Sequence, residues 1–175
     1  MTAFTHLDDA GHARMVDVTE KTPTVRAATA SAMVHCNAEV MDHLRSGTTP
    51  KGDVFAVARI AGINAAKKCA ELLPLAHVIG VHGASVQVDL HDDGIAISAT
   101  VRTADRTGVE MEALTAASVA ALAVVDMVKG IDKGTWISHV RLEAKDGGRS
   151  GSWRRAKDPD SVDDTSARTH AGEER

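Results

Sequence analysis

A chain of 175 residues is long enough for one domain with its own core and a short additional tail. Its net charge of −4, two Phe, two Trp and no Tyr argue against nucleic-acid binding, which usually needs a basic face or exposed aromatic rings. No signal peptide opens the chain, and no run of about 18 apolar residues occurs in it. We therefore expect a cytoplasmic protein that contacts neither nucleic acid nor membrane.

The two cysteines, Cys36 and Cys69, both fall inside segments that we expect to be helical. In a reduced cytosol they are expected to pack as small apolar residues rather than to form a disulfide. No HExxH motif and no Cys/His spacing typical of a zinc site is present, so we predict no metal site.

The first elements are predicted from alternation and capping residues. Residues 15–18 alternate apolar and polar side chains, which suggests a short edge strand. Residues 24–45 are predicted to form a helix that Thr22 or Thr24 caps and Gly47 ends.

A second helix is predicted after the loop at 48–52. Asp53 can cap this helix, which is expected to run to about Leu73, where Pro74 stops it. Helical spacing places one apolar stripe on it, formed by Val54, Ala58, Ala61, Ala65, Cys69 and Leu72.

Two alternating segments, 81–90 and 95–103, predict a hairpin whose loop ends at Gly94, where a positive φ is expected. A third helix is predicted over 112–131 and a last strand over 136–144. Hairpins together with grouped helices favour an α+β fold, with an antiparallel sheet and the helices on one face.

The composition changes after the glycine-rich turn at 147–151. Beyond Trp153 the chain is charged, rich in Ser and Thr, and almost without apolar residues, although Trp153 itself could anchor the start of this segment. We therefore expect one domain over residues 1–151 and a disordered tail over 152–175.

The segment 107–129 carries charged residues at both ends of a stretch of small residues. Glu110 and Glu112 lie at its start, in a lead-in expected to be extended, and Asp126 and Lys129 lie one helical turn apart at its end. On geometry alone these could be acids favouring a helix N-terminus and an exposed ion pair. In a straight helix Glu112 and Asp126 would lie about 21 Å apart. Either a long substrate spans them or they serve different sites across a dimer, with the small residues allowing close helix contact.

Several segments together resemble the cyclic pyranopterin monophosphate synthase family of molybdenum cofactor biosynthesis. The similarity extends over about residues 4–151. It is carried by MVDV at 15–18, KGDVFAVARIAGINAAK at 51–67, LPLAH at 73–77, the whole of 107–129, and VRL at 140–142 followed by Lys145 and the glycines at 147–148.

The resemblance implies a ferredoxin-like fold and a homohexamer, built as a trimer of dimers, with the active site at a subunit interface. It implies a lyase that converts 3′,8-cyclo-7,8-dihydro-GTP to cyclic pyranopterin monophosphate and releases pyrophosphate, without a metal or organic cofactor. It also implies site residues. Catalytic roles fall to Asp126, its acid–base companion Lys129, and Lys51; substrate-binding roles fall to Leu75, Ala76, His77, Glu110, Met111, Glu112 and Lys145.

In a site shared by two subunits, we expect Lys51 and Asp126 to come from opposite chains. One local departure from the family occurs where it usually shows Leu-Cys-His-Pro, because this chain has Ala76 and Val78 beside His77. Proline there would restrict the backbone of the loop.

Two alternatives stay open at this stage. One is a ferredoxin-like RNA-binding module, against which the acidic charge and the absence of strand aromatics count. The other is a catalytically weakened or inactive paralogue that acts as an oligomeric binding protein.

Overall fold

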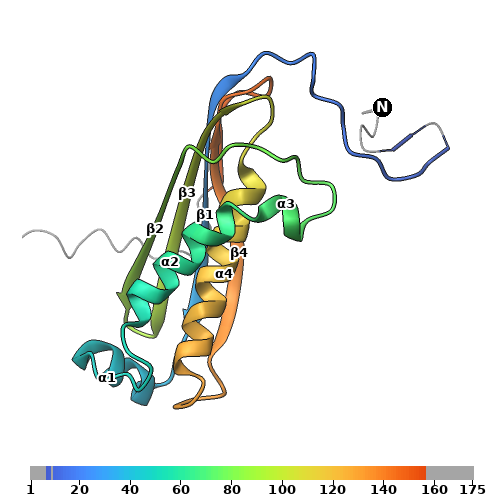
Figure 1. The fold of residues 1–175 in the computed structure, drawn as a ribbon. Helices are drawn as coiled ribbons and strands as arrows, with labels where there is room; N and C mark the ends of the chain where they lie inside the picture. Colours follow the sequence, from blue (N-terminus) through green and yellow to red (C-terminus); the bar gives the residue numbers. More distant parts are fainter. Residues whose placement is uncertain (1–6, 9, 157–175) are drawn as a thin grey trace, which may run out of the picture.

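The protein is described by a computed structural model that covers residues 7–8 and 10–156. Its elements, in chain order, are β1 Thr24–His35, α1 Ala38–Ser46, α2 Val54–Ala66, α3 Cys69–Leu72, β2 Gly83–His91, β3 Gly94–Asp105, α4 Glu110–Val128, β4 Trp136–Asp146 and β5 Trp153–Arg154 (Figure 1).

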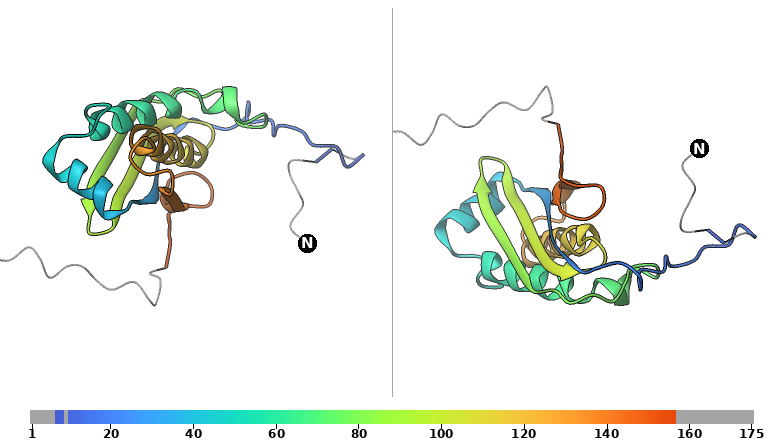
Figure 2. Two further views of the ribbon diagram at one scale, coloured as in Figure 1. Left: turned by 90° about the horizontal axis from the view of Figure 1, so that it is seen from below. Right: turned by 90° about the horizontal axis from the view of Figure 1, so that it is seen from above.

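The strands form one antiparallel sheet in the order β2-β3-β1-β4-β5. The two long helices, α2 and α4, pack against each other and against one face of this sheet, as the views along the strands also show (Figure 2). The core lies between these two layers and is built mostly of Ala, Val and Ile. The predicted α+β, ferredoxin-like architecture is therefore confirmed.

The predicted helix over 24–45 is wrong. Its first part is the central strand β1, in which the alternate residues Ala28, Ala30, Ala32 and Val34 are buried. Alanine favours helices in isolation. In a strand that is paired on both sides, burial of every second residue against the core overrides that preference. Only the second part is helical, as α1; the Asn37 side chain caps it, and Gly47 ends it with φ 68°, as expected.

The other differences in this half of the chain are smaller. Residues 15–18 form no strand. Asp53 caps α2 as predicted, because its carboxylate accepts the Ala56 N–H at 2.9 Å. The predicted second helix is interrupted after Ala66 and continues as the short α3, whose last residue, Leu72, is exposed.

The predicted hairpin is present as β2 and β3, but the reason for its glycine is different. Gly94 is not among the residues with positive φ. It begins β3 opposite the end of β1, where a Cβ atom would lie 2.0 Å from the carbonyl oxygen of Val34. Close approach of the two strands, rather than turn geometry, therefore requires glycine at this position.

The small residues of α4 are covered within the same chain. α2 packs so closely on α4 that a Cβ at Gly62 would lie 2.9 Å from the Ala116 carbonyl oxygen. By length and composition alone α4 could cross a membrane, yet half of its apolar window is buried by the sheet and α2, as in a core helix. The stripe of small residues therefore does not by itself indicate a second subunit.

The sheet continues into the segment assigned to the tail. β5 pairs with the end of β4 through Trp153 opposite Lys145 and Arg154 opposite Ala144. The sheet therefore extends beyond residue 151, and the rest of the predicted tail, 157–175, lies outside the described residues. Both cysteines are free; Cys36 lies between β1 and α1 rather than in a helix, and Cys69 is buried in α3.

Candidate active site

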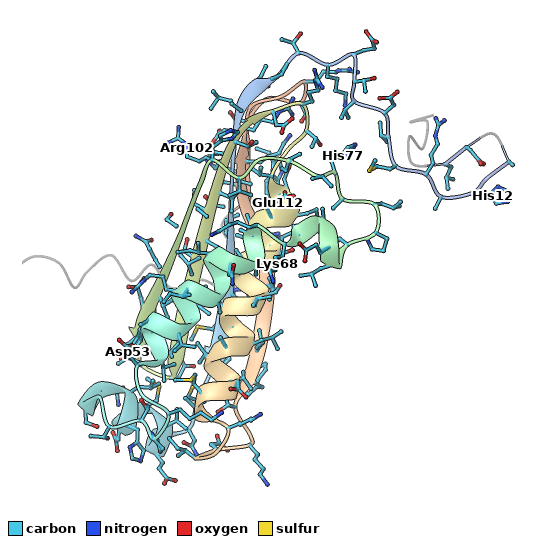
Figure 3. All side chains as sticks on the ribbon, in the orientation of Figure 1. His12, Asp53, Lys68, His77, Arg102 and Glu112 are labelled. Atoms are coloured by element: carbon cyan, nitrogen blue, oxygen red, sulfur yellow. The ribbon has the colours of Figure 1, made fainter. Side chains whose placement is uncertain are left out.

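The residues singled out from the sequence gather in two places, at opposite ends of α4. We call Lys51, Asp126 and Lys129 the lysine–aspartate cluster, at the C-terminal end of the helix. We call the cavity around His77 and the first turn of α4 the His77 pocket. Figure 3 shows Glu112 and His77 near one end of α4, and Asp53, two residues after Lys51, near the other.

The lysine–aspartate cluster is a carboxylate held by two ammonium groups. Lys129 Nζ lies 2.7 Å from Asp126 Oδ1, and Lys51 Nζ lies 3.0 Å from Asp126 Oδ2. Lys51 also donates to the Asp126 backbone carbonyl at 2.7 Å. Both lysines thereby place positive charge at the helix C-terminus, where the backbone carbonyls favour cations.

Local structure explains how Lys51 reaches the helix. The loop that carries it turns through Gly52, with φ 92°, whose N–H donates to the Thr49 carbonyl at 3.0 Å. The next residue, Asp53, caps α2, which packs along α4. The tight turn and the cap together direct the Lys51 side chain to the last turn of the neighbouring helix.

The electrostatics of the cluster follow from its ion pairs. The hydrogen bond from Lys129, followed by that from Lys51, lowers the pKa of Asp126 below its usual range. The three side chains are 44–58% exposed in the single chain. The carboxylate is thus ionised at neutral pH, and the two ammonium groups stand open to an anionic ligand.

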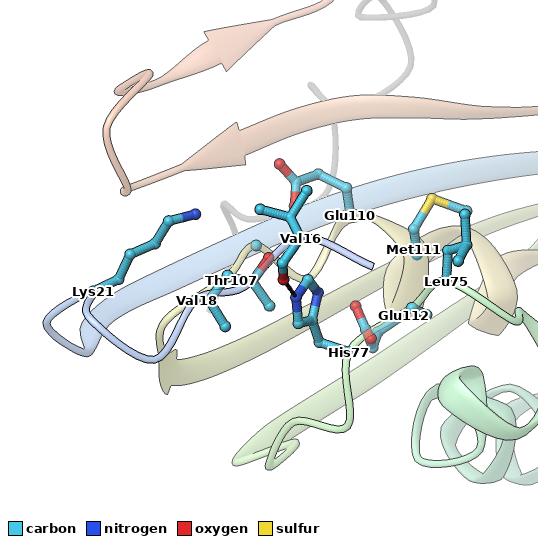
Figure 4. A pocket seen from close by; sticks show the side chains of 11 residues that line it. Val16, Val18, Lys21, Leu75, His77, Thr107, Glu110, Met111 and Glu112 are labelled. Carbon is cyan, nitrogen blue, oxygen red and sulfur yellow. Dashed lines mark hydrogen bonds between the residues drawn. The ribbon is translucent and has the colours of Figure 1, made fainter. Parts of the chain in front are cut away.

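The His77 pocket is a cavity of about 390 Å³ between the loop 73–77, the start of α4 and the segment before β1 (Figure 4). It brings together six predicted binding residues, three from each of two distant segments. Leu75, Ala76 and His77 come from the loop, and Glu110, Met111 and Glu112 come from the first turn of α4. Its remaining lining residues are Val16, Val18, Lys21, Thr107 and Gly108.

His77 is held by the segment that precedes the sheet. Its Nε2 lies 2.7 Å from the Val16 carbonyl oxygen, as the dashed line in Figure 4 marks. Because a carbonyl oxygen can only accept, Nε2 carries the hydrogen, and in the neutral ring Nδ1 is then the acceptor. The structure therefore defines both the orientation and the neutral tautomer of this ring.

Glu112 is a buried carboxylate at the wall of the pocket. Only 4% of the residue is exposed, and this burial raises its pKa, opposed chiefly by a hydrogen bond from its own backbone N–H. Glu110 and Glu112 are not in an extended lead-in as predicted, since α4 already begins at Glu110. Residues two apart in a helix diverge, so the two acids enter the cavity from different sides.

Lys145 is joined to the pocket through Glu110. Its Nζ lies 3.9 Å from Glu110 Oε1, and it also donates to the Ser150 hydroxyl in the glycine-rich turn. β4 thereby contributes a cation beside the acidic start of α4. Within the described part of the chain, no group of three or more His, Cys, Asp or Glu side chains could hold a metal ion.

The expectation that Lys51 and Asp126 come from opposite chains is contradicted by these contacts, because both residues meet within one chain. What α4 does separate is Glu112 from Asp126, by about 21 Å. The separation along α4 therefore lies between the cluster and the pocket, not inside the cluster.

Sequence reasoning missed several residues that the structure adds to the pocket. Lys21, Val16 and Val18 come from the segment around 15–18, which was assigned to an edge strand. Thr107 and Gly108 are inside the similar segment 107–129 but were given no role. A cation three residues after a family-like motif was the signal that could have indicated Lys21.

The family of this chain follows from its similarity to known proteins. The model of the MoaC family matches residues 15–148, which include every predicted site residue. The chain belongs to the MoaC family.

Curated relatives agree with this MoaC assignment over nearly their whole length. A cyclic pyranopterin monophosphate synthase of Streptomyces coelicolor is 56% identical over 153 residues, covering 87% of this chain and 90% of the relative. Proteins of the same name from Nocardioides sp. and Geobacter sulfurreducens are 54% and 52% identical, each over 155 residues; 87% of this chain and 95% and 97% of the relatives are covered.

Proposed function

We propose that this protein is a cyclic pyranopterin monophosphate synthase of molybdenum cofactor biosynthesis. The reaction converts 3′,8-cyclo-7,8-dihydro-GTP to cyclic pyranopterin monophosphate and releases pyrophosphate. The observation that carries the proposal is identity of 52–56% to proteins of that name across 87% of the chain. Every residue that the resemblance implicates lies in the cluster, in the pocket, or, for Lys145, beside the pocket.

The lysine–aspartate cluster suits the phosphate side of this chemistry. Closing a cyclic monophosphate requires a substrate hydroxyl to lose its proton and attack the α-phosphorus, while pyrophosphate leaves with negative charge. Lys51 and Lys129 can stabilise that charge, and the Lys129–Asp126 pair can exchange protons once a ligand or partner excludes water. We assign the catalytic roles to these three residues.

The His77 pocket suits the guanine-derived ring system. A buried carboxylate such as Glu112 accepts hydrogen bonds from a ring N–H edge, and the neighbouring Met111 offers an apolar surface. His77 Nδ1 has no hydrogen-bond partner among the residues that the structure describes, and the backbone of Leu75 and Ala76 completes the wall. We assign substrate binding to these residues together with Glu110 and Lys145.

The assembly is part of the proposal. A reacting centre cannot contact Glu112 and Asp126 of one chain when about 21 Å separates them. We infer a site in which the cluster of one subunit faces the pocket of another, in a homohexamer built as a trimer of dimers. A cytoplasmic location, independence of metal or organic cofactors, and the absence of nucleic-acid and membrane partners belong to the same proposal.

The direct test is incubation of the purified protein with 3′,8-cyclo-7,8-dihydro-GTP, with pyrophosphate release and the cyclic product measured by mass spectrometry. We expect stoichiometric formation of both products without added metal. Binding of the substrate with no turnover would instead identify a non-catalytic paralogue. The absence of both binding and turnover would refute the assignment.

A further inference from the structure

We propose that α4 pairs antiparallel with the α4 of a second copy of this chain, about a two-fold axis that crosses the helix midway between Ser118 and Leu122. The pairing places the lysine–aspartate cluster of each subunit against the His77 pocket of the other. The inference names the surface that completes the proposed site, and it rests on the proposed function for its catalytic consequence.

The outer face of α4 carries a seam with the spacing of a coiled coil. The seam residues follow one another at alternating steps of four and three: Met111, Thr115, Ser118, Leu122, Val125 and Lys129. None of the six is buried in the single chain, whereas residues of the opposite face, such as Ala113 and Ala120, are fully buried. Alternation of four and three is the spacing by which two helices pack along their length. The chain therefore presents a helix-packing surface that it does not itself cover.

The seam maps onto itself under the two-fold axis. Three pairs of seam residues share one midpoint, at position 120: Met111 with Lys129, Thr115 with Val125, and Ser118 with Leu122. An antiparallel partner sets each member of a pair against the other member in the second chain. In two of these layers a small hydroxyl side chain faces a larger aliphatic one, so the two rows can interdigitate.

The hydroxyl groups of the seam do not need water. Ser118 Oγ donates to the Leu114 carbonyl at 2.8 Å, and Thr115 Oγ1 donates to Cys69 Sγ at 3.6 Å. Hydroxyls with partners in their own chain can be buried at a contact without losing a hydrogen bond. The seam thus offers mainly apolar surface, above all at Leu122, which is 57% exposed.

The two ends of α4 carry complementary charge. The first turn has Glu110 and Glu112, and the other end has Lys129 and the neighbouring Lys51, which share the one carboxylate of Asp126. Antiparallel pairing brings the cationic end of each helix to the acidic end of the other and opposes the two helix dipoles. Parallel pairing would set like charges together at both ends, so charge selects the antiparallel arrangement.

A second copy suits the seam better than the C-terminal end of the same chain. Residues 157–175 contain a single large aliphatic side chain, Val162, which cannot fill a row of seam positions. Complementarity of one surface to itself, in both register and charge, is the property of an interface between identical subunits.

The pairing overcomes the separation along the helix. Within one chain Met111 and Lys129 lie about 27 Å apart, but the axes of two packed helices lie only about 8–10 Å apart. Lys129 of the partner subunit then stands beside Met111, at the wall of the His77 pocket. A dimer built in this way has two equivalent sites, each incomplete without the other chain.

Cysteine cross-linking tests the register without requiring turnover. Ser118→Cys and Leu122→Cys are coexpressed in a Cys36→Ala background, in which the remaining native thiol, Cys69, is buried. We expect mild oxidation to link the two different variants in about half of the dimers, the share that random assembly makes hybrid. Met111→Cys alone is the matched control on the same seam and should not cross-link, because its counterpart lies about 27 Å away.

Efficient cross-linking of Met111→Cys to itself would show a parallel pair, and no link between positions 118 and 122 would show no pair in this register. Either result would overturn the inference. A link that forms only after truncation behind Arg155 would place the C-terminal segment on the seam instead and would also overturn it.

Leu122→Asp tests the consequence for the site. Like charges placed beside the axis should separate the subunits, halve the molar mass in light scattering and lower turnover of 3′,8-cyclo-7,8-dihydro-GTP at least about a hundredfold. Ile60→Asp, at a 66% exposed apolar position of α2, is the control and should change neither quantity. Wild-type mass or near wild-type turnover in folded Leu122→Asp would contradict the pairing.

The two proposals fail separately. A chain that cross-links between positions 118 and 122 but forms no product refutes the proposed function and leaves the pairing intact. A chain that turns over without that cross-link keeps its function and refutes the pairing.

Discussion

Glu112 and Asp126 lie fourteen residues apart on the uninterrupted helix α4. Glu112 lines the His77 pocket, and Asp126 belongs to the lysine–aspartate cluster. At 1.5 Å per residue this corresponds to about 21 Å, too far for one reacting centre to contact both. The helix therefore works as a spacer between the lysine–aspartate cluster and the His77 pocket.

The two lysines of the cluster should be essential for product formation. We expect Lys51→Ala and Lys129→Ala each to lower kcat by at least about a hundredfold, because each removes a cation that contacts Asp126. The oligomer, measured by light scattering, should be unchanged. Lys133→Ala, at an exposed lysine just beyond the helix, is the control and should retain activity. Turnover within threefold of wild type in either cluster variant would remove that lysine from the mechanism.

Subunit mixing should separate the cluster from the pocket. Asp126→Ala and Glu112→Gln should each be inactive, but a mixture that exchanges subunits should recover about a quarter of wild-type activity. Half of the dimers are then hybrids, and each hybrid has one intact site out of two.

A mixture of Lys51→Ala with Asp126→Ala is the internal control, since both residues belong to one cluster in one chain. It should recover nothing. If the first mixture also stays inactive while labelled subunits prove exchange, the cluster and the pocket of a single chain form the site.

Glu112→Gln should stabilise the protein at neutral pH while abolishing function. Burial raises the pKa of Glu112 in the folded chain above its ordinary value of 4.5, so ionisation costs folding free energy. The wild type should therefore lose stability relative to the variant as pH rises from 4.5 through the folded pKa. In thermal unfolding, the melting temperature of the variant should be a few degrees above that of wild type at pH 8 and equal to it near pH 4.

Glu110→Gln provides the comparison, because Glu110 is more exposed and lies near Lys145. It should show no such pH-dependent gain. A Glu112→Gln variant less stable than wild type at pH 8 would mean that the carboxylate is a net stabilising group.

Val78→Pro should be tolerated. Val78 is 92% exposed, and its N–H makes no hydrogen bond to any residue that the structure describes. Proline there would reduce the conformational freedom of the unfolded loop. We expect an unchanged KM and an equal or slightly higher melting temperature; loss of substrate binding in a folded variant would contradict our account of how the loop presents His77.

The effect of truncating the C-terminal end of the chain should depend on whether β5 is kept. Truncation after Arg155 keeps the pairing of Trp153 with Lys145 and the hydrogen bond from the Arg155 N–H to the Glu143 carbonyl, so activity and stability should stay near wild type. Truncation after Gly151 removes β5 and should weaken the surroundings of Lys145. Strong hydrogen-exchange protection of amides beyond 157 would show that the last residues dock instead.

The prediction that failed most clearly concerns β1. Residues 24–45 are rich in alanine, which has a high helix propensity. Yet Ala28, Ala30 and Ala32, at every second position of a strand, are all buried in the core. A strand in the middle of a sheet is stabilised by partners distant in sequence, here β3 and β4, so local composition cannot identify it. Helices with their own caps, such as the one that Asp53 begins, were found correctly for the opposite reason.

The sequence by itself determined the fold class, the hairpin, the family, and the Asp126–Lys129 pair, since an i, i+3 spacing on a helix places two side chains together without any partner element. It also determined that Glu112 and Asp126 are far apart. Only the tertiary structure decided that Lys51 joins Asp126 in the same chain, that Val16 orients His77, and that the Thr115 hydroxyl donates to the Cys69 thiol. Each of these contacts joins segments more than 40 residues apart, and packing of α2, α3 and the first segment around α4, rather than any local pattern, brings them together.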